Sequence, residues 1–303
     1  MELKKAHSSE TDFLENDLDN LSENKTSLAD KLQKIDRRIL YLILLIVIAI
    51  PTLWPVNIPN SPLRMSRDLW NTINDTPPNK MVLISSSWTK NTRGENQGQM
   101  QAIVEQMMSR HIRFAISTFD PRGSQVALNL VQSLAKKYNY IYGKNWVSFG
   151  YQPNGVNYVK GLSVDLLATV KRDAVLKQPL SSLPVMKGIH SADDFQIVVE
   201  ISAASTQYYW IQYLKPGIKV GFACTSVMAP ESLPYYTSHQ LTGLLWGAKG
   251  AYDYEQLNVE HHTGNWGAGR QYMGPLSAAF GLVILSILVG NIAMFSSRKN
   301  KRI

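Results

Sequence analysis

Cysteine is nearly absent from this chain, which has a single residue of that type, Cys224, among 303. One cysteine excludes a disulfide within the chain. Because Cys224 lies in the apolar run 220–225, we expect a small buried core residue rather than a reactive thiol. The absence of disulfides sets no limit on folding, since a domain of about 200 residues buries enough apolar surface to be stable without them.

Sequence motifs that hold phosphate or activate a nucleophile are also missing. The first predicted strand is followed by SSSWTKNTRGENQG, not by the GxGxxG of a dinucleotide-binding turn. The chain has no GxxxxGK[ST] and no GxSxG, so the common nucleotide-hydrolase and serine-hydrolase patterns are excluded. We therefore expect no cofactor.

Metal-binding patterns are equally scarce. His261 and His262 are adjacent, and neighbouring side chains rarely point into one site. No HExxH motif supports them. We predict no metal site, and an exposed loop at these histidines.

Long uncharged runs are present at two places. The run 275–295, PLSAAFGLVILSILVGNIAMF, is long enough as a helix to cross a hydrocarbon core of about 30 Å. The run 39–56 begins with ILYLILLIVIAI, then continues past Pro51 to Trp54 and Val56. We predict two membrane-spanning helices, the first an uncleaved signal anchor because 38 residues precede it.

Basic residues flank both runs on their outer sides. Lys31, Lys34, Arg37 and Arg38 precede the first, and a basic tail follows the second. The positive-inside rule then places both termini in the cytoplasm and the main domain outside the cytoplasmic membrane. In that location the net charge of +8 favours anionic lipid headgroups or an acidic partner rather than nucleic acid.

The N-terminal tail has an apolar seam at heptad spacing, interrupted by one lysine. It favours association, as a coiled coil between identical chains or as an amphipathic helix on another subunit or the membrane. The seam comprises Leu14, Leu18, Leu21, Lys25, Leu28, Leu32 and Ile35.

The middle of the chain alternates short apolar runs with amphipathic ones, which is typical of a mostly parallel sheet covered by helices on both faces. The predicted fold class is α/β with Rossmann-like layering. Strands are expected at 81–86, 112–119, 146–151, 196–202 and 219–225, and the stretch 235–257 is expected to be a helix. The predicted organisation is a tail 1–38, a span 39–56, an extended linker 57–79, the α/β domain 80–260, a glycine-rich connection 261–274, a span 275–295 and a basic tail 296–303.

Ligands of open parallel sheets bind at the carboxyl ends of the strands. The candidate ligand-binding residues there are Ser85, Ser86, Ser87, Asp120, Glu200, Thr225 and Ser226. Glu200 is the most unusual, because a carboxylate inside the apolar run QIVVEIS must be paired, protonated or at the sheet end. Hydroxyl and carboxylate residues are also common helix caps, so this set names no catalytic group.

Three functions fit these features. The favoured one is a non-catalytic structural or assembly subunit of a membrane complex, bound to other subunits or to copies of itself. The second is an extracytoplasmic sensor signalling through the tail. The third is a membrane-anchored enzyme acting on an envelope substrate. A pocket with perturbed carboxylates at the strand ends would favour the enzyme, and a filled sheet end the scaffold.

Overall fold

The computed structural model describes residues 36–300, with side-chain environments for 36–295. It divides into two compact units, one formed by Pro55–Gly274 and the other by the flanking segments. The heptad seam at 14–35 lies outside the described residues.

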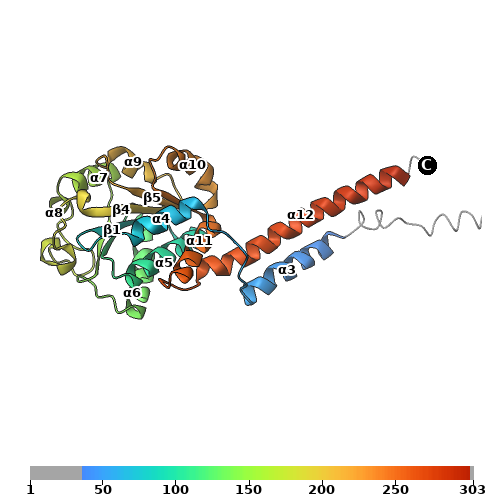
Figure 1. The fold of residues 1–303 in the computed structure, drawn as a ribbon, viewed down its shortest axis with the longest axis horizontal. Coiled ribbons are helices and arrows are strands. Elements are labelled where there is room, and N and C mark those ends of the chain that lie inside the picture. Colours follow the sequence, from blue (N-terminus) through green and yellow to red (C-terminus); the bar gives the residue numbers. More distant parts are fainter. Residues whose placement is uncertain (1–35, 301–303) are drawn as a thin grey trace, which may run out of the picture. The chain divides into compact units, whose positions relative to one another are not determined.

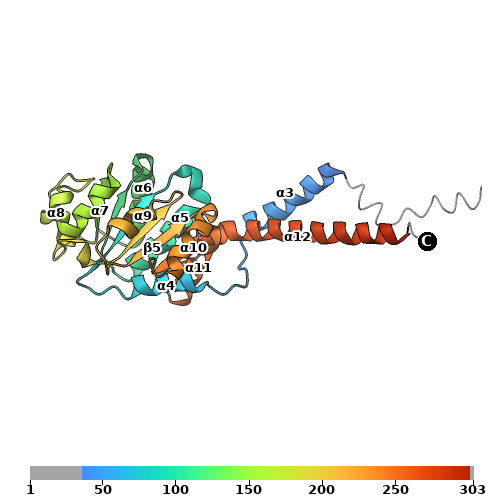
Figure 2. The same ribbon diagram turned by 90° about the horizontal axis from the view of Figure 1, so that it is seen from above.

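A six-stranded sheet forms the centre of the larger unit (Figures 1 and 2). Its strand order is β3-β2-β1-β4-β5-β6 and every pairing is parallel, which confirms the predicted α/β class. This is the strand order of doubly wound dinucleotide-binding folds. In such folds successive strands are added in one direction from β1 to β3 and in the opposite direction from β4 onward, so the order reverses between β1 and β4. The strands are β1 (Met81–Ser87), β2 (Phe114–Thr118), β3 (Trp146–Tyr151), β4 (Phe195–Ser202), β5 (Val220–Cys224) and β6 (Gly243–Trp246).

Helices cover both faces of the sheet, because right-handed crossovers carry the β1–β2 and β2–β3 connections to one face and the later connections to the other. The helices directly before β1 and directly after β6 lie on the first of these faces. The first face packs against α4 (Arg64–Asn74), α5 (Arg93–Ser109), α6 (Pro121–Lys137) and α11 (Gly247–Glu260). The second packs against α7 (Gly155–Val164), α8 (Leu166–Thr169), α9 (Gln207–Tyr213), α10 (Ala229–Thr237) and the 3-10 turns of the β3–β4 connection.

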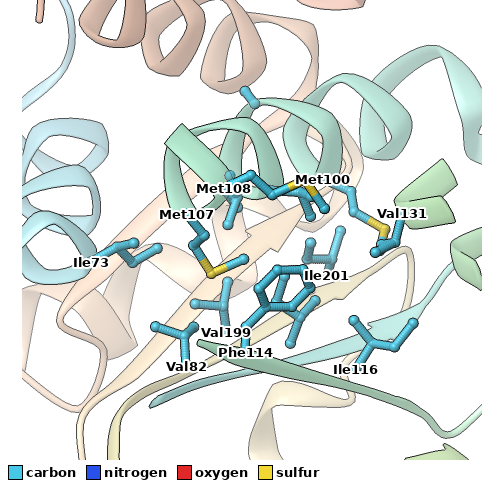
Figure 3. Packing of buried hydrophobic residues seen from close by; sticks show 14 of the residues in the cluster. Ile73, Val82, Met100, Met107, Met108, Phe114, Ile116, Val131, Val199 and Ile201 are labelled. Atoms are coloured by element: carbon cyan, nitrogen blue, oxygen red, sulfur yellow. The ribbon is translucent and has the colours of Figure 1, made fainter. Parts of the chain in front are cut away.

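The core on the first face is rich in methionine. Met100, Met107 and Met108 of α5 pack above Val82 and Val199 of the sheet (Figure 3). Unbranched thioether side chains fill irregular gaps, so the methionines of this helix can cover strands of different side-chain shape.

Two local structures differ from the sequence expectation. Helix α4 lies within the stretch 57–79 that was expected to be extended, between the proline pairs at 59 and 62 and at 77 and 78. The stretch 235–257 is not one helix: it contains the end of α10, strand β6 and most of α11. Strand β6 is only four residues long, GLLW. An apolar run this short shows no periodicity that would distinguish a strand from a helix.

The smaller unit contains α3 (Arg37–Leu53) and most of α12 (Ala268–Asn300). Among the described residues, α12 is the one helix long and apolar enough to cross a membrane. The two predicted spans are thus reduced to one candidate. Helix α3 has 17 residues and a length of about 25 Å, because the chain leaves the helix at Trp54 instead of continuing through Val56.

Candidate functional site

A row of buried polar side chains crosses the centre of the sheet near its carboxyl edge. Ser117 of β2, Ser85 of β1 and Glu200 of β4 are register partners on neighbouring strands. Residues in register on parallel strands point to the same face, and here that face is the one covered by α7 and α9. The predicted ligand-binding set includes Ser85 and Glu200 of this row but not Ser117.

Glu200 is fully buried, and this chain supplies partners for both of its carboxylate oxygens. Its Oε1 accepts a hydrogen bond from the Thr206 hydroxyl at 2.6 Å, and its Oε2 accepts one from the Trp210 indole N–H at 2.8 Å. Burial raises the pKa of Glu200 to about 7, and the hydrogen bonds oppose that rise. The carboxyl group therefore titrates near neutral pH.

Three hydroxyl groups near this carboxyl have no hydrogen-bond partner among the described residues. They belong to Ser85, Ser117 and Tyr158, and all three are buried. Burial also raises the pKa of Tyr158 well above its usual value, so its hydroxyl stays protonated. Together with Glu200, Thr206 and Trp210, these residues are called the polar cluster.

Aromatic rings close the crevice above the polar cluster. The ring of Phe119 lies 6.0 Å from Tyr158, 5.3 Å from Tyr209 and 5.6 Å from Trp210, measured between centroids. The Phe119 N–H donates to the Ser87 hydroxyl oxygen at 3.1 Å, which ties the end of β2 to the end of β1. The space that holds ligands in doubly wound folds is thus filled by side chains of this protein.

The remaining predicted residues do not join the cluster. The Ser86 hydroxyl faces the opposite side of the sheet and donates to the sulfur of Met100 at 3.4 Å. Ser226 donates through both its backbone N–H and its hydroxyl to Glu95, and Thr225 precedes a 3-10 turn without a side-chain cap. These hydroxyls have separate structural roles.

Asp120 also lies apart from the cluster, at the N-terminus of α6. It accepts a hydrogen bond from the Arg122 N–H and pairs with the Arg122 guanidinium at 3.1 Å. The hydrogen bond from the Arg122 side chain lowers the pKa of Asp120, which therefore stays ionised. Asp120 is a helix cap.

Sequence reasoning missed Ser117, Tyr158, Thr206 and Trp210. Ser117 carried a detectable signal, because it is a hydroxyl residue near the carboxyl end of its strand, as Ser85 is in the neighbouring strand. Tyr158 and Trp210 lie on helices that meet the sheet only in the folded chain, so their spacing in the sequence gives no such signal.

A second group of buried carboxylates lies on α11, where it holds the segments that enter and leave the larger unit. Asp253 accepts hydrogen bonds from the Asn60 amide at 2.6 Å and the Leu63 N–H at 3.0 Å, and it pairs with Lys249. Glu255 accepts from the N–H groups of Gly269 and Arg270, at 2.7 and 2.9 Å. Both carboxylates therefore satisfy helix N-termini, that of α4 and that of α12.

Metal-binding side chains are not gathered in residues 36–300. No group of three or more His, Cys, Asp or Glu residues could hold a metal there. His261 stacks on Trp70 with 4.4 Å between ring centroids. Cys224 is buried, and burial raises the pKa of its thiol to about 12, so the reactive thiolate is disfavoured.

Comparison with known proteins gives no relative from which a function could be transferred. No protein-family model, no curated protein and no solved structure matches this chain. Its strand order alone does not imply an activity, since many unrelated functions share one fold.

Proposed function

We propose that this protein is a membrane-anchored, non-catalytic subunit of a larger assembly, whose α/β domain presents a rigid surface to its partners. The filled crevice at the β1–β4 switch point carries this proposal. An enzyme or sensor using that crevice needs access to Glu200, but both oxygens of this carboxylate are bonded within the chain and Phe119 covers the approach.

The anchor in this proposal is α12. Its apolar part exposes large side chains that include Phe280, Ile284 and Ile292, at 60%, 59% and 68% of their surface. Such a continuous apolar surface is expensive in water and is matched by a bilayer.

The finer topology is also part of the proposal. Helix α3 exposes Ile39, Leu45 and Ile50, as a lipid-facing helix would. Its length of about 25 Å approaches the hydrocarbon thickness, and Arg37 and Arg38 stand at its start. With the basic C-terminal tail, the positive-inside rule favours a topology in which both termini are cytoplasmic and the α/β domain is outside.

The attachment of the domain to its connecting segments suits a rigid scaffold. The Tyr252 hydroxyl exchanges hydrogen bonds with the backbone N–H and C=O of Ile58, at 2.8 and 2.9 Å. Asp253 and Glu255 hold the segments on either side as described above. The connecting segments are therefore fixed to α11 by several side-chain hydrogen bonds.

Association through the tail can be tested by native mass determination after gentle detergent extraction. Leu21→Asp with Leu28→Asp places two charges on the heptad seam and is expected to reduce the native mass. Asn20→Asp with Ser27→Asp is the matched control, because it adds two charges with the same seven-residue separation off the seam.

A large assembly with stoichiometric partners, lost in the seam variant and kept in the control, supports the subunit proposal. If the unmodified protein is a monomer and the seam variant has the same native mass, the proposal is contradicted.

A further inference from the structure

A basic groove lies at the carboxyl edge of the sheet on the face opposite the polar cluster. Its volume is about 560 Å³. The connection from β1 to α5 and the first residue of α5 provide Trp88, Lys90 and Arg93, and the first turns of α6 provide Arg122 and Gln125. Two separate elements thus converge on one concave surface.

The positive charge of the groove is only partly neutralised. Lys90 and Arg93 form no ion pair with any described residue, and the Arg93 Nε–H donates to the neutral Gln97 at 2.5 Å. Arg122 pairs with Asp120. Three cations and one carboxylate leave a net charge of about +2 at the groove, where the low-dielectric walls of a cleft strengthen attraction for anions.

The groove also contains hydrogen-bond donors that are arranged on fixed elements. Trp88 is 1% exposed, and its indole N–H is buried without an acceptor among the described residues. The side-chain amides of Gln97 and Gln125 line the same surface. The N-terminus of the 17-residue helix α6 adds the positive end of its dipole.

We propose that this groove binds a phosphate-bearing anion, with Lys90, Arg93 and Arg122 as the cationic contacts. A guanidinium matches two phosphate oxygens at once, and an ammonium adds a compact charge. This inference is independent of the proposed scaffold function, because it concerns the opposite face of the sheet from the filled crevice.

Two sources supply the same chemistry, a phospholipid headgroup and a soluble phosphate ester. Gln97 also lines a second groove of about 400 Å³ that contains Trp266 and Arg270, a few residues before the apolar run 275–295. Tryptophan and arginine are typical of the lipid headgroup level. A headgroup is therefore one of the two sources to be tested.

The experiment uses the full chain in nanodiscs. In the first arm the discs contain only phosphatidylcholine, and glycerol phosphate is titrated by calorimetry at low and high salt. In the second arm the discs contain phosphatidylglycerol in addition, and native mass spectrometry counts the anionic lipids retained. Lys90→Gln with Arg93→Gln is compared with Arg67→Gln and Lys144→Gln, which remove the same two residue types from exposed positions outside the groove.

Salt-sensitive binding of glycerol phosphate that weakens about tenfold or more in the groove variant, and not in the control, supports a soluble ester. If the unmodified protein and the control variant retain phosphatidylglycerol and the groove variant does not, the bound group is a lipid headgroup. Binding in neither arm, or equal losses in the groove and control variants, overturns the proposal.

Discussion

At the scale of single residues, the chain places polar groups in its core where the sequence around them is apolar. Glu200 is the clearest case, with a raised pKa and both oxygens bonded. Such a group is tolerated because its hydrogen bonds offset part of the desolvation cost. Its effect should be visible in the pH dependence of stability.

Glu200→Gln is expected to flatten that dependence. Because the folded-state pKa of about 7 lies above the ordinary value of 4.5, the folded state binds this proton more tightly than the unfolded state. The stability contributed by Glu200 is therefore fully present below pH 4.5 and is lost as pH rises towards 7, by on the order of 3 kcal/mol. The free energy of unfolding, measured with urea at pH 5 and pH 8, should differ less between the two pH values in Glu200→Gln than in the unmodified protein. Glu260→Gln, at an exposed position, should keep the full difference. An unchanged slope in Glu200→Gln would contradict the assignment.

Gly123 is required by a close backbone approach. A Cβ at this position would lie 2.6 Å from the Trp88 carbonyl oxygen, where α6 meets the end of β1. Gly123→Ala is expected to lower the free energy of unfolding by about 1–3 kcal/mol. Gly94→Ala is the matched control, because it lies in α5 with no atom within 4 Å of its added Cβ, and it should be neutral or stabilising by up to about 1 kcal/mol. Equal melting temperatures for the two variants would falsify the close-contact argument.

At the scale of secondary-structure elements, α11 is the helix that fixes the two connections of the larger unit. Glu255 provides a carboxylate for the first N–H groups of α12, and burial raises its pKa to about 7. Close packing assists this contact, because Gly98 of α5 leaves room for Gly269, whose N lies 3.1 Å from the Cβ position of Gly98. The start of α12 therefore depends on tertiary contacts and not on its own sequence.

Glu255→Ala is expected to release the first turn of α12. Loss of the carboxylate leaves the N–H groups of Gly269 and Arg270 without their acceptor, at a cost of about 1–3 kcal/mol. Hydrogen exchange of a peptide covering 266–272 should become roughly tenfold faster, while exchange in β1 and β4 stays slow. Glu260→Ala, on the same helix but exposed, serves as control, and equal exchange in both variants would rule out the capping role.

At the scale of the whole molecule, the proposed topology separates the α/β domain from both termini by a membrane. Cys224 assists a labelling test, because the thiol is buried and its raised pKa makes it unreactive in the folded protein. Single cysteines can therefore be introduced without removing the native residue.

Lys144→Cys should react with a membrane-impermeant maleimide in intact cells, whereas Ser8→Cys and Lys301→Cys should react only after lysis. Lys144 is exposed on the domain, and the other two positions lie in the tails. Labelling of Ser8→Cys in intact cells, with Lys301→Cys protected, would mean that α3 does not cross the membrane. Protection of Lys144→Cys would overturn the external location of the domain.

The sequence alone determined the layered α/β class and the apolar run of α12, because hydrophobic periodicity and run length report directly on burial and on the solvent of each segment. It also predicted Ser85 and Glu200 at one sheet edge, because parallel strands share the orientation of their carboxyl ends. Only the tertiary structure decided three further features. Strand β6 is too short to show a period, α3 ends before the hydrocarbon thickness is reached, and the crevice above Glu200 is filled by Phe119, Tyr158 and Trp210. These rings come from three different connections, and long-range packing, which has no local pattern, brings them together.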